Sequence, residues 1–153
     1  MRVTMLIGIA VVAWALVGTG PATAGSASWA VQANAVCKTQ KAKTRVVRAR
    51  LQKTVQPLIR HQPLTHAQWS YVLHTSLQLL RVRLRELERV PSPVPPLGQR
   101  ALRLTRLNVA ELARATQAFE KGNSVQFVHW FGVWAGDARA DPVWRTLGAS
   151  QCI

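Results

Sequence analysis

The feature that most constrains the fold is a regular run of leucines in the middle of the chain. Their separations are four, three, four and three residues, at Leu73, Leu77, Leu80, Leu84 and Leu87. This seven-residue repeat places one apolar seam along an α-helix and suits packing nearly parallel or antiparallel to neighbouring helices. No segment alternates cleanly between apolar and polar residues with the period of two typical of strands. We therefore expect an all-α protein.

Prolines and capping residues set the expected limits of the first two helices. The first is expected from residue 28 or 29 to residue 56, with Pro57 ending or kinking it. The second begins at a capping box formed by Thr65 and Gln68. It stops before the proline-rich segment 91–96, because residues that precede proline disfavour helical backbone angles.

The second half of the chain predicts two further helices and a short turn. The third helix spans about 97–121, and Gly122 offers a left-handed C-terminal cap. The fourth runs from about residue 124 to residue 140, and a terminal turn capped by Asp141 follows. Four helices with short connections predict an up-down-up-down four-helix bundle.

The N-terminal segment is typical of a signal peptide and is set apart from the domain. Arg2 supplies the positive start, residues 5–18 are apolar, and the small residues "ATA" at 22–24 suit a signal peptidase. The sequence thus predicts a signal peptide at 1–24, one domain at 25–153, and a secreted or envelope location. An uncleaved N-terminal anchor is the alternative. Attachment of lipid is not expected, because no cysteine closely follows the apolar run.

Two cysteines, Cys37 and Cys152, lie in the exported part of the chain. An even number in an oxidising compartment favours a disulfide, and two free thiols are the alternative. In an up-down-up-down path, the start of the first helix and the end of the fourth share one end of the bundle, which supports the pairing. There is no CxxC or CxxCH motif, so neither structural zinc nor covalently attached haem is expected.

The chain resembles a loose group of small secreted or lipid-anchored actinobacterial proteins. Three short elements carry the resemblance: an early Asn-x-x-Cys, a central leucine followed by a proline pair, and a late Leu-Gly before the last cysteine, here Asn34, Cys37, Leu87, Pro95, Pro96, Leu147, Gly148 and Cys152. The resemblance implies a disulfide-closed helical bundle outside the membrane, and it implies no activity. This chain is more basic than the group and lacks its lipid-attachment motif.

The charge is strongly one-sided, with 20 Lys and Arg against 6 Asp and Glu and a net charge of +14. The candidate anion-binding residues form two clusters on the second and third helices, at Arg81, Arg85, Arg89, Arg100, Arg103 and Arg106. Lys41, Arg45 and Arg48 add positive charge to the first helix. Guanidinium groups match phosphate and carboxylate oxygens in shape and charge. A solvated charged face without a ligand is the alternative.

These clusters predict a non-catalytic binding module for anionic partners. The expected partners are an anionic polymer, an anionic lipid surface or an acidic protein, and export argues against sequence-specific nucleic-acid binding. A peripheral membrane protein that uses basic amphipathic helices is a second interpretation. A small bundle enzyme or cofactor carrier is a third.

The sequence offers little to the third interpretation. His66 and His74 are eight residues apart, which is about 12 Å along a helix and too far for one ion. Glu86 and Glu88 are two apart and point in different directions on a helix. There is no phosphate-binding glycine loop and no nucleophile elbow. We expect no catalytic residue, metal or cofactor.

An aromatic-rich segment at 126–144 remains to be placed. Phe127, Trp130, Phe131 and Trp134 follow helical spacings with Ala138 and share one broad face. We interpret this face as core packing rather than as a binding surface. His129 lies on the same helix but away from that face.

Overall fold

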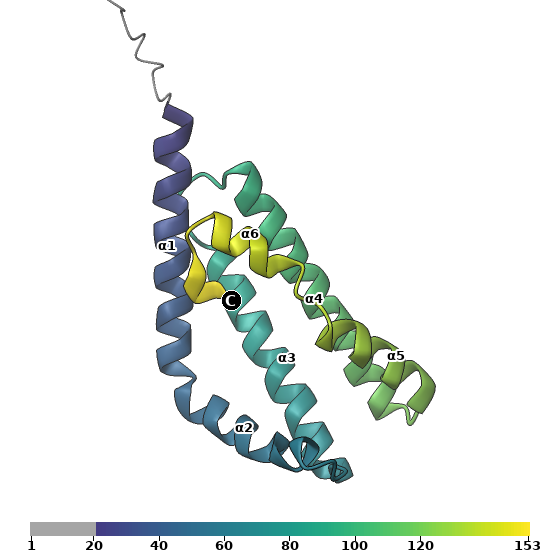
Figure 1. Ribbon diagram of the computed structural model, residues 1–153. Coiled ribbons are helices and arrows are strands. Elements are labelled where there is room, and N and C mark those ends of the chain that lie inside the picture. Colours follow the sequence, from purple (N-terminus) through teal and green to yellow (C-terminus); the bar gives the residue numbers. More distant parts are fainter. Residues whose placement is uncertain (1–20) are drawn as a thin grey trace, which may run out of the picture.

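A computed structural model describes residues 21–153, with side chains from Trp29 onward (Figure 1). The described residues are mostly helical and contain no strand, which confirms the expected all-α class. The helices are α1 Pro21–Lys43, α2 Arg45–Ile59, α3 His66–Glu88, α4 Pro96–Glu120, α5 Ser124–Ala135 and α6 Ala140–Thr146, followed by a 3-10 turn η1 at Ser150–Cys152. The signal peptide prediction falls mostly on residues 1–20, which lie outside the described residues.

The predicted first helix is divided at Thr44, and Figure 1 shows α2 turning sharply away from the end of α1. The Thr44 hydroxyl donates to the Gln40 carbonyl at 2.6 Å, a side-chain bond of the kind that bends helices. Pro57 does not end the helix, because α2 continues to Ile59. Arg60 and His61 then donate to the Pro57 and Leu58 carbonyls, and His61 takes a positive φ of 57°.

Helices α3 and α4 form the antiparallel pair that the sequence predicts (Figure 1). The capping box at the start of α3 is present: the Gln68 amide donates to Thr65 Oγ1 at 3.2 Å, and the Thr65 amide to Gln68 Oε1 at 2.8 Å. The leucine seam faces α4 unevenly, since Leu73, Leu77 and Leu87 are buried whereas Leu80 and Leu84 are half-buried. Helix α4 therefore leaves part of the leucine seam uncovered.

The last quarter of the chain departs most from the predicted bundle. Helix α5 ends at Ala135 rather than near residue 140, and Gly136 caps it by donating to the Gly132 carbonyl. The predicted cap at Asp141 is wrong, because α6 begins earlier and places Asp141 inside its first turn. A four-helix up-down path is therefore not confirmed. The described residues form six α-helices: the first predicted helix divides into α1 and α2, the fourth ends early as α5, and α6 lies where the terminal turn was predicted.

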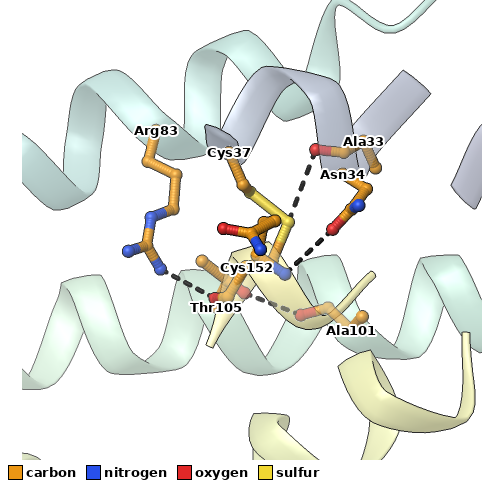
Figure 2. The surroundings of a disulfide bond; sticks show 8 residues. Ala33, Asn34, Cys37, Arg83, Ala101, Thr105 and Cys152 are labelled. Atoms are coloured by element: carbon orange, nitrogen blue, oxygen red, sulfur yellow. Dashed lines mark hydrogen bonds between the residues drawn. A yellow bond between two sulfur atoms is a disulfide. The ribbon is translucent and has the colours of Figure 1, made fainter. Parts of the chain in front are cut away.

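The Cys37–Cys152 disulfide is confirmed, with the two Cα atoms 5.1 Å apart across 115 residues of sequence. The cysteines meet by a different route from the predicted one. Helix α6 folds back across α4, and η1 then lies against the second half of α1 (Figures 1 and 2). The Gln151 amide donates to Asn34 Oδ1 at 2.9 Å, which fixes η1 on α1 beside the disulfide.

The buried residues form two separate clusters. The larger surrounds the disulfide and includes Trp29 of α1 stacked on Trp144 of α6, with ring centroids 6.0 Å apart. The smaller lies between α3, α4 and α5 around Leu73, Leu77 and Leu112. Helix α2 contributes no buried residue to either cluster. One side of α3 is thus covered only loosely, and a cleft lies there.

Candidate anion-binding site

The six predicted arginines lie exposed along α3 and α4, but the structure divides them by pairing. Arg89 Nη1 lies 3.4 Å from Glu86 Oε1, and Arg106 Nε lies 2.8 Å from Glu88 Oε1. In the described part of the chain the other four have no ion pair with a carboxylate: Arg81, Arg85, Arg100 and Arg103. The unpaired members are therefore the stronger candidates for an external anion.

Arg81 lies in a shallow groove between α3 and α4. Arg114 of α4 lines the same groove, although the sequence interpretation left it out. The Arg114 guanidinium lies 4.5 Å from the centre of the Trp130 ring, so α5 holds it in place through a cation–π contact. One carboxylate shares this groove, that of Glu120, whose Oε1 lies 3.0 Å from His74 Nε2.

A second group of cations gathers where α1, α2 and α3 meet, and we call it the cationic cluster: Lys41, Arg48 and Arg83. Arg83 Nη1 donates to the Cys152 carbonyl at 2.9 Å, so the disulfide end of η1 positions this guanidinium (Figure 2). Arg48 Nε donates to Thr44 Oγ1 at 3.0 Å, which holds it at the bend between α1 and α2. Within the described residues, the remaining guanidinium N–H groups of both arginines have no hydrogen-bond acceptor.

Burial and mutual repulsion lower the pKa values of two members of the cationic cluster. Burial lowers the pKa of Arg83, the positive charge of Arg48 lowers it further, and Asp141 partly opposes the shift. Burial also lowers the pKa of Lys41, and the charges of Arg83 and Arg48 add to that effect. A bound anion would stabilise the charged forms of these partly buried cations, because it would offset their desolvation and their mutual repulsion.

The cationic cluster borders a cleft of about 810 Å³ between α2, α3 and α5. The floor is α3, and the walls come from α2 and α5. Most of the lining is apolar or aromatic, and Arg48, Arg83 and Asp137 are its charged members, the full set being Arg48, Leu51, Gln52, Val55, Val72, Ser76, Leu79, Leu80, Arg83, Asn108, Phe131, Trp134, Ala135 and Asp137. This volume is within the range of roughly 300–1,000 Å³ found for small-molecule sites.

The aromatic face of α5 packs as predicted in part only. Phe127, Phe131 and Trp134 lie against the smaller core cluster, and Trp69 of α3 meets both phenylalanines edge to face. No residue of α5 is buried, however, and Trp130 is half-exposed beside Arg114. The predicted core packing of this face is therefore only partial, because α2 does not pack against α5. His129, Gly136 and Ala138 are exposed, and Ala138 lies beyond the end of α5.

A polar network fixes the end of α5 on α4. Trp134 Nε1 donates to Asn108 Oδ1 at 3.2 Å, and Asn108 Nδ2 lies 3.5 Å from Asp137 Oδ2. Arg139 then joins two acids, with Nε 2.7 Å from Asp137 Oδ1 and Nη2 2.7 Å from Glu111 Oε1. The Asp137 carboxylate is thus committed to Arg139 and is a weak competitor for the neighbouring cationic cluster.

This network predicts a specific acid sensitivity. The side-chain hydrogen bond from Arg139 is the main cause that holds the pKa of Asp137 below its ordinary value, against the opposing effect of desolvation. A carboxyl with a lower pKa when folded contributes stability that is fully present above its unfolded pKa and is lost as pH falls through the folded value. We expect Asp137→Asn to lower the free energy of unfolding at pH 7, and the difference from wild type to shrink as pH falls below the ordinary carboxyl pKa of about 4.

Urea unfolding followed by circular dichroism at pH 7, 5 and 3 measures this effect. Glu86→Gln is the matched control, because it removes a carboxylate from an exposed pair with Arg89 that contributes about 0–1 kcal/mol. A loss for Asp137→Asn that stays constant from pH 7 to pH 3 would contradict the assignment.

Arg83 is the site residue that the sequence interpretation missed. It flanks the leucine seam on the side of Val72 and Leu79, whereas Arg81 flanks the seam on the opposite side. The two arginines have equivalent spacings from the leucines, so the sequence alone did not distinguish them. Arg48 was counted only as surface charge, because the bend at Thr44 that turns it toward α3 leaves no mark in the sequence.

The described residues contain no group of three or more His, Cys, Asp or Glu side chains placed to hold a metal ion. None of their helices has the length and apolar character needed to cross a membrane.

The chain was compared with models of protein families, with curated proteins and with solved structures, and none of them matches it. The function proposed below therefore depends on the chemistry of the described residues.

Proposed function

We propose that this protein is a non-catalytic binding module of the cell envelope that takes anionic ligands through its unpaired cations. One observation carries the proposal: the acidic side chains are already engaged within the protein. Four of the six lie in ion pairs with arginine, at Glu86, Glu88, Glu111 and Asp137, and a fifth, Glu120, has its Oε1 atom 3.0 Å from His74 Nε2. Three arginines and one histidine take up these five carboxylates, so the rest of the Lys and Arg excess is left for external anions.

The disulfide supports an extracytoplasmic location for this function, because such bonds persist in oxidising compartments. An exported protein meets anionic wall polymers, lipid headgroups and acidic proteins. The net charge of +14 attracts such partners over distances of about a Debye length, roughly 10 Å at 0.1 M salt. The groove with Arg81 and Arg114 and the cationic cluster then offer places where guanidinium groups can contact oxygen atoms of the ligand.

Binding to long-chain polyphosphate at increasing salt tests the proposal. We expect the logarithm of the binding constant to fall linearly with the logarithm of salt concentration, because bound cations release counterions from the polymer. Arg81→Gln/Arg85→Gln should weaken binding and reduce the slope by about one for each arginine that binds a phosphate group. Fluorescence anisotropy with a labelled polymer measures both.

Arg45→Gln/Lys53→Gln is the matched control, because it removes the same charge from exposed positions on α2. We expect at least a threefold smaller loss of affinity than for the α3 variant, since Arg81 lines one groove with Arg114 and another with Arg85, so the α3 pair belongs to a larger group of cations. Binding that does not weaken as salt rises would overturn the proposed function.

A further inference from the structure

The cleft between α2, α3 and α5 combines two surfaces that the proposed function does not need together. One end carries the cationic cluster, and the rest is an apolar channel. Along α3, Arg83 and Val72 both line the cleft and lie eleven residues apart, which is about 16 Å of helix. Because α3 forms the floor of the cleft, the charged end and the apolar part of the cleft lie one after the other along this helix.

The charged end has the donors that an oxyanion needs. Arg83 and Arg48 each direct one N–H group to a protein oxygen, and their other guanidinium N–H groups have no acceptor in the described chain. Two acids lie nearby: Asp137 is held by Arg139, and Asp141 partly offsets the charge of Arg83. With Lys41 the cluster keeps a positive excess, and a phosphate or carboxylate head would complete it.

The apolar part is open because its α2 wall is poorly covered. Leu51 and Val55 of α2 are half-buried and face Leu79 and Leu80 of α3 across the cleft, while α5 supplies Phe131 and Trp134 from the other side. Helix α2 has no buried residue, although its inward positions are apolar. A chain of methylene groups laid between these walls would remove apolar surface from water on both partners.

We propose that the cleft binds one single-chain amphiphile, with its phosphate or carboxylate head at the cationic cluster and its alkyl chain between α2, α3 and α5. Charge complementarity selects the head, and the apolar walls select the chain. The inference rests on the proposed function, because both require an anion to bind. It adds that the ligand of this cleft is a free lipid-like molecule, held in one defined place rather than spread over the surface.

Isothermal titration calorimetry with a series of defined amphiphiles, each kept below its micelle-forming concentration, tests head and chain separately. Dodecyl phosphate should bind, and octyl phosphate should bind at least tenfold more weakly, because each buried methylene contributes about a two- to fourfold gain. Dodecyl maltoside has the same chain without a charge and should also bind at least tenfold more weakly. Inorganic phosphate should bind weakest of the charged probes.

Two substitutions on α2 locate the site. Arg48→Gln should weaken dodecyl phosphate binding by about tenfold and leave dodecyl maltoside unchanged, because a charge-assisted hydrogen bond to the head is removed. Leu51→Gln should weaken both by about five- to tenfold, since it places a polar group in the wall. Arg45→Gln is the matched control on the same helix and should change neither by more than twofold. Circular dichroism establishes that each variant is folded.

The outcomes separate this inference from the proposed function. Equal affinity for inorganic phosphate and dodecyl phosphate, or no effect of Leu51→Gln, would overturn the cleft as a chain site while polyphosphate binding could still stand. Equal affinity for dodecyl maltoside and dodecyl phosphate would overturn the head position. Binding to phosphatidylglycerol vesicles but not to dodecyl phosphate monomers would place the protein on a bilayer surface and overturn the inference. If neither dodecyl phosphate nor polyphosphate bound to the protein, the inference and the proposed function would both be overturned.

Discussion

Removing the disulfide through Cys37→Ala/Cys152→Ala is expected to lower the free energy of unfolding by about 4–5 kcal/mol. The bond joins residues 115 apart, so without it the unfolded chain gains the entropy of a very long open loop. Whole domains are stable by about 5–15 kcal/mol, so this loss could leave little of the folded state at 37 °C. Urea unfolding of wild type and variant at pH 7 measures the difference.

The disulfide also helps to fix the position of Arg83, so its removal should affect ligand binding as well as stability. Cys152 also presents the carbonyl that accepts from Arg83, and η1 is held to α1 by the Gln151–Asn34 hydrogen bond. When the bond is absent, η1 can separate from α1 and Arg83 loses its fixed acceptor. We therefore expect reduced wild-type protein to bind dodecyl phosphate more weakly than the oxidised form, with a melting temperature close to that of the double variant.

Reduction of wild type with dithiothreitol provides the control, because it breaks the bond without changing a residue. Reduced wild type and the double alanine variant should agree in free energy of unfolding to within about 1 kcal/mol, the part left to cavity effects of the missing sulfur atoms. A loss below about 1 kcal/mol in both would show that the core alone holds η1 on α1. That outcome would contradict the role given to the disulfide.

The parts of the fold that the sequence predicted are those with local signals. Helix α3 begins at Thr65 because the capping box is formed by residues three apart, and a proline-rich link separates α3 from α4. The disulfide followed from residue count and compartment. By contrast, the bend at Thr44 comes with a side-chain hydrogen bond that a threonine makes in only some helices, and the return of α6 over α4 depends on tertiary contacts, so sequence patterns gave no warning of either.

The sequence predicted the positive charge of the candidate site but not the position of the site in the fold. Periodicity correctly put Arg81 and Arg85 on an outer face of α3. It could not show which arginines would be neutralised, because the pair of Arg106 and Glu88 joins two helices. The cleft was missed for a similar reason. The aromatic face of α5 has the spacing of a core helix, and it is open only because α2 bends away from it.

Trp29→Ala is expected to lower the free energy of unfolding by about 3–5 kcal/mol. Trp29 is 0 % exposed, stacks on Trp144 and reaches the start of α4 at Gly98. It is thus the side chain through which α1 contacts both α4 and α6. Trp130→Ala is the matched control, since that ring is half-exposed on α5 and its removal leaves no enclosed cavity. A loss for Trp29→Ala no larger than that for Trp130→Ala would contradict this role.

The contact with Gly98 allows a sharper test of how α1 is seated. A methyl group added at Gly98 would lie 2.9 Å from Cζ3 of Trp29 and 3.0 Å from Cγ1 of Val94. Gly98→Ala should therefore destabilise the protein by about 1–3 kcal/mol, even though alanine favours helix by about 1 kcal/mol. Trp29→Phe leaves a smaller ring there and removes an indole N–H that is buried without an acceptor in the described residues. In that background Gly98→Ala should cost at least 1 kcal/mol less, because the shortest of the close contacts, the one with the indole ring, is removed. Strictly additive effects in this double-mutant cycle would mean that Trp29 does not set the approach of α1 to α4.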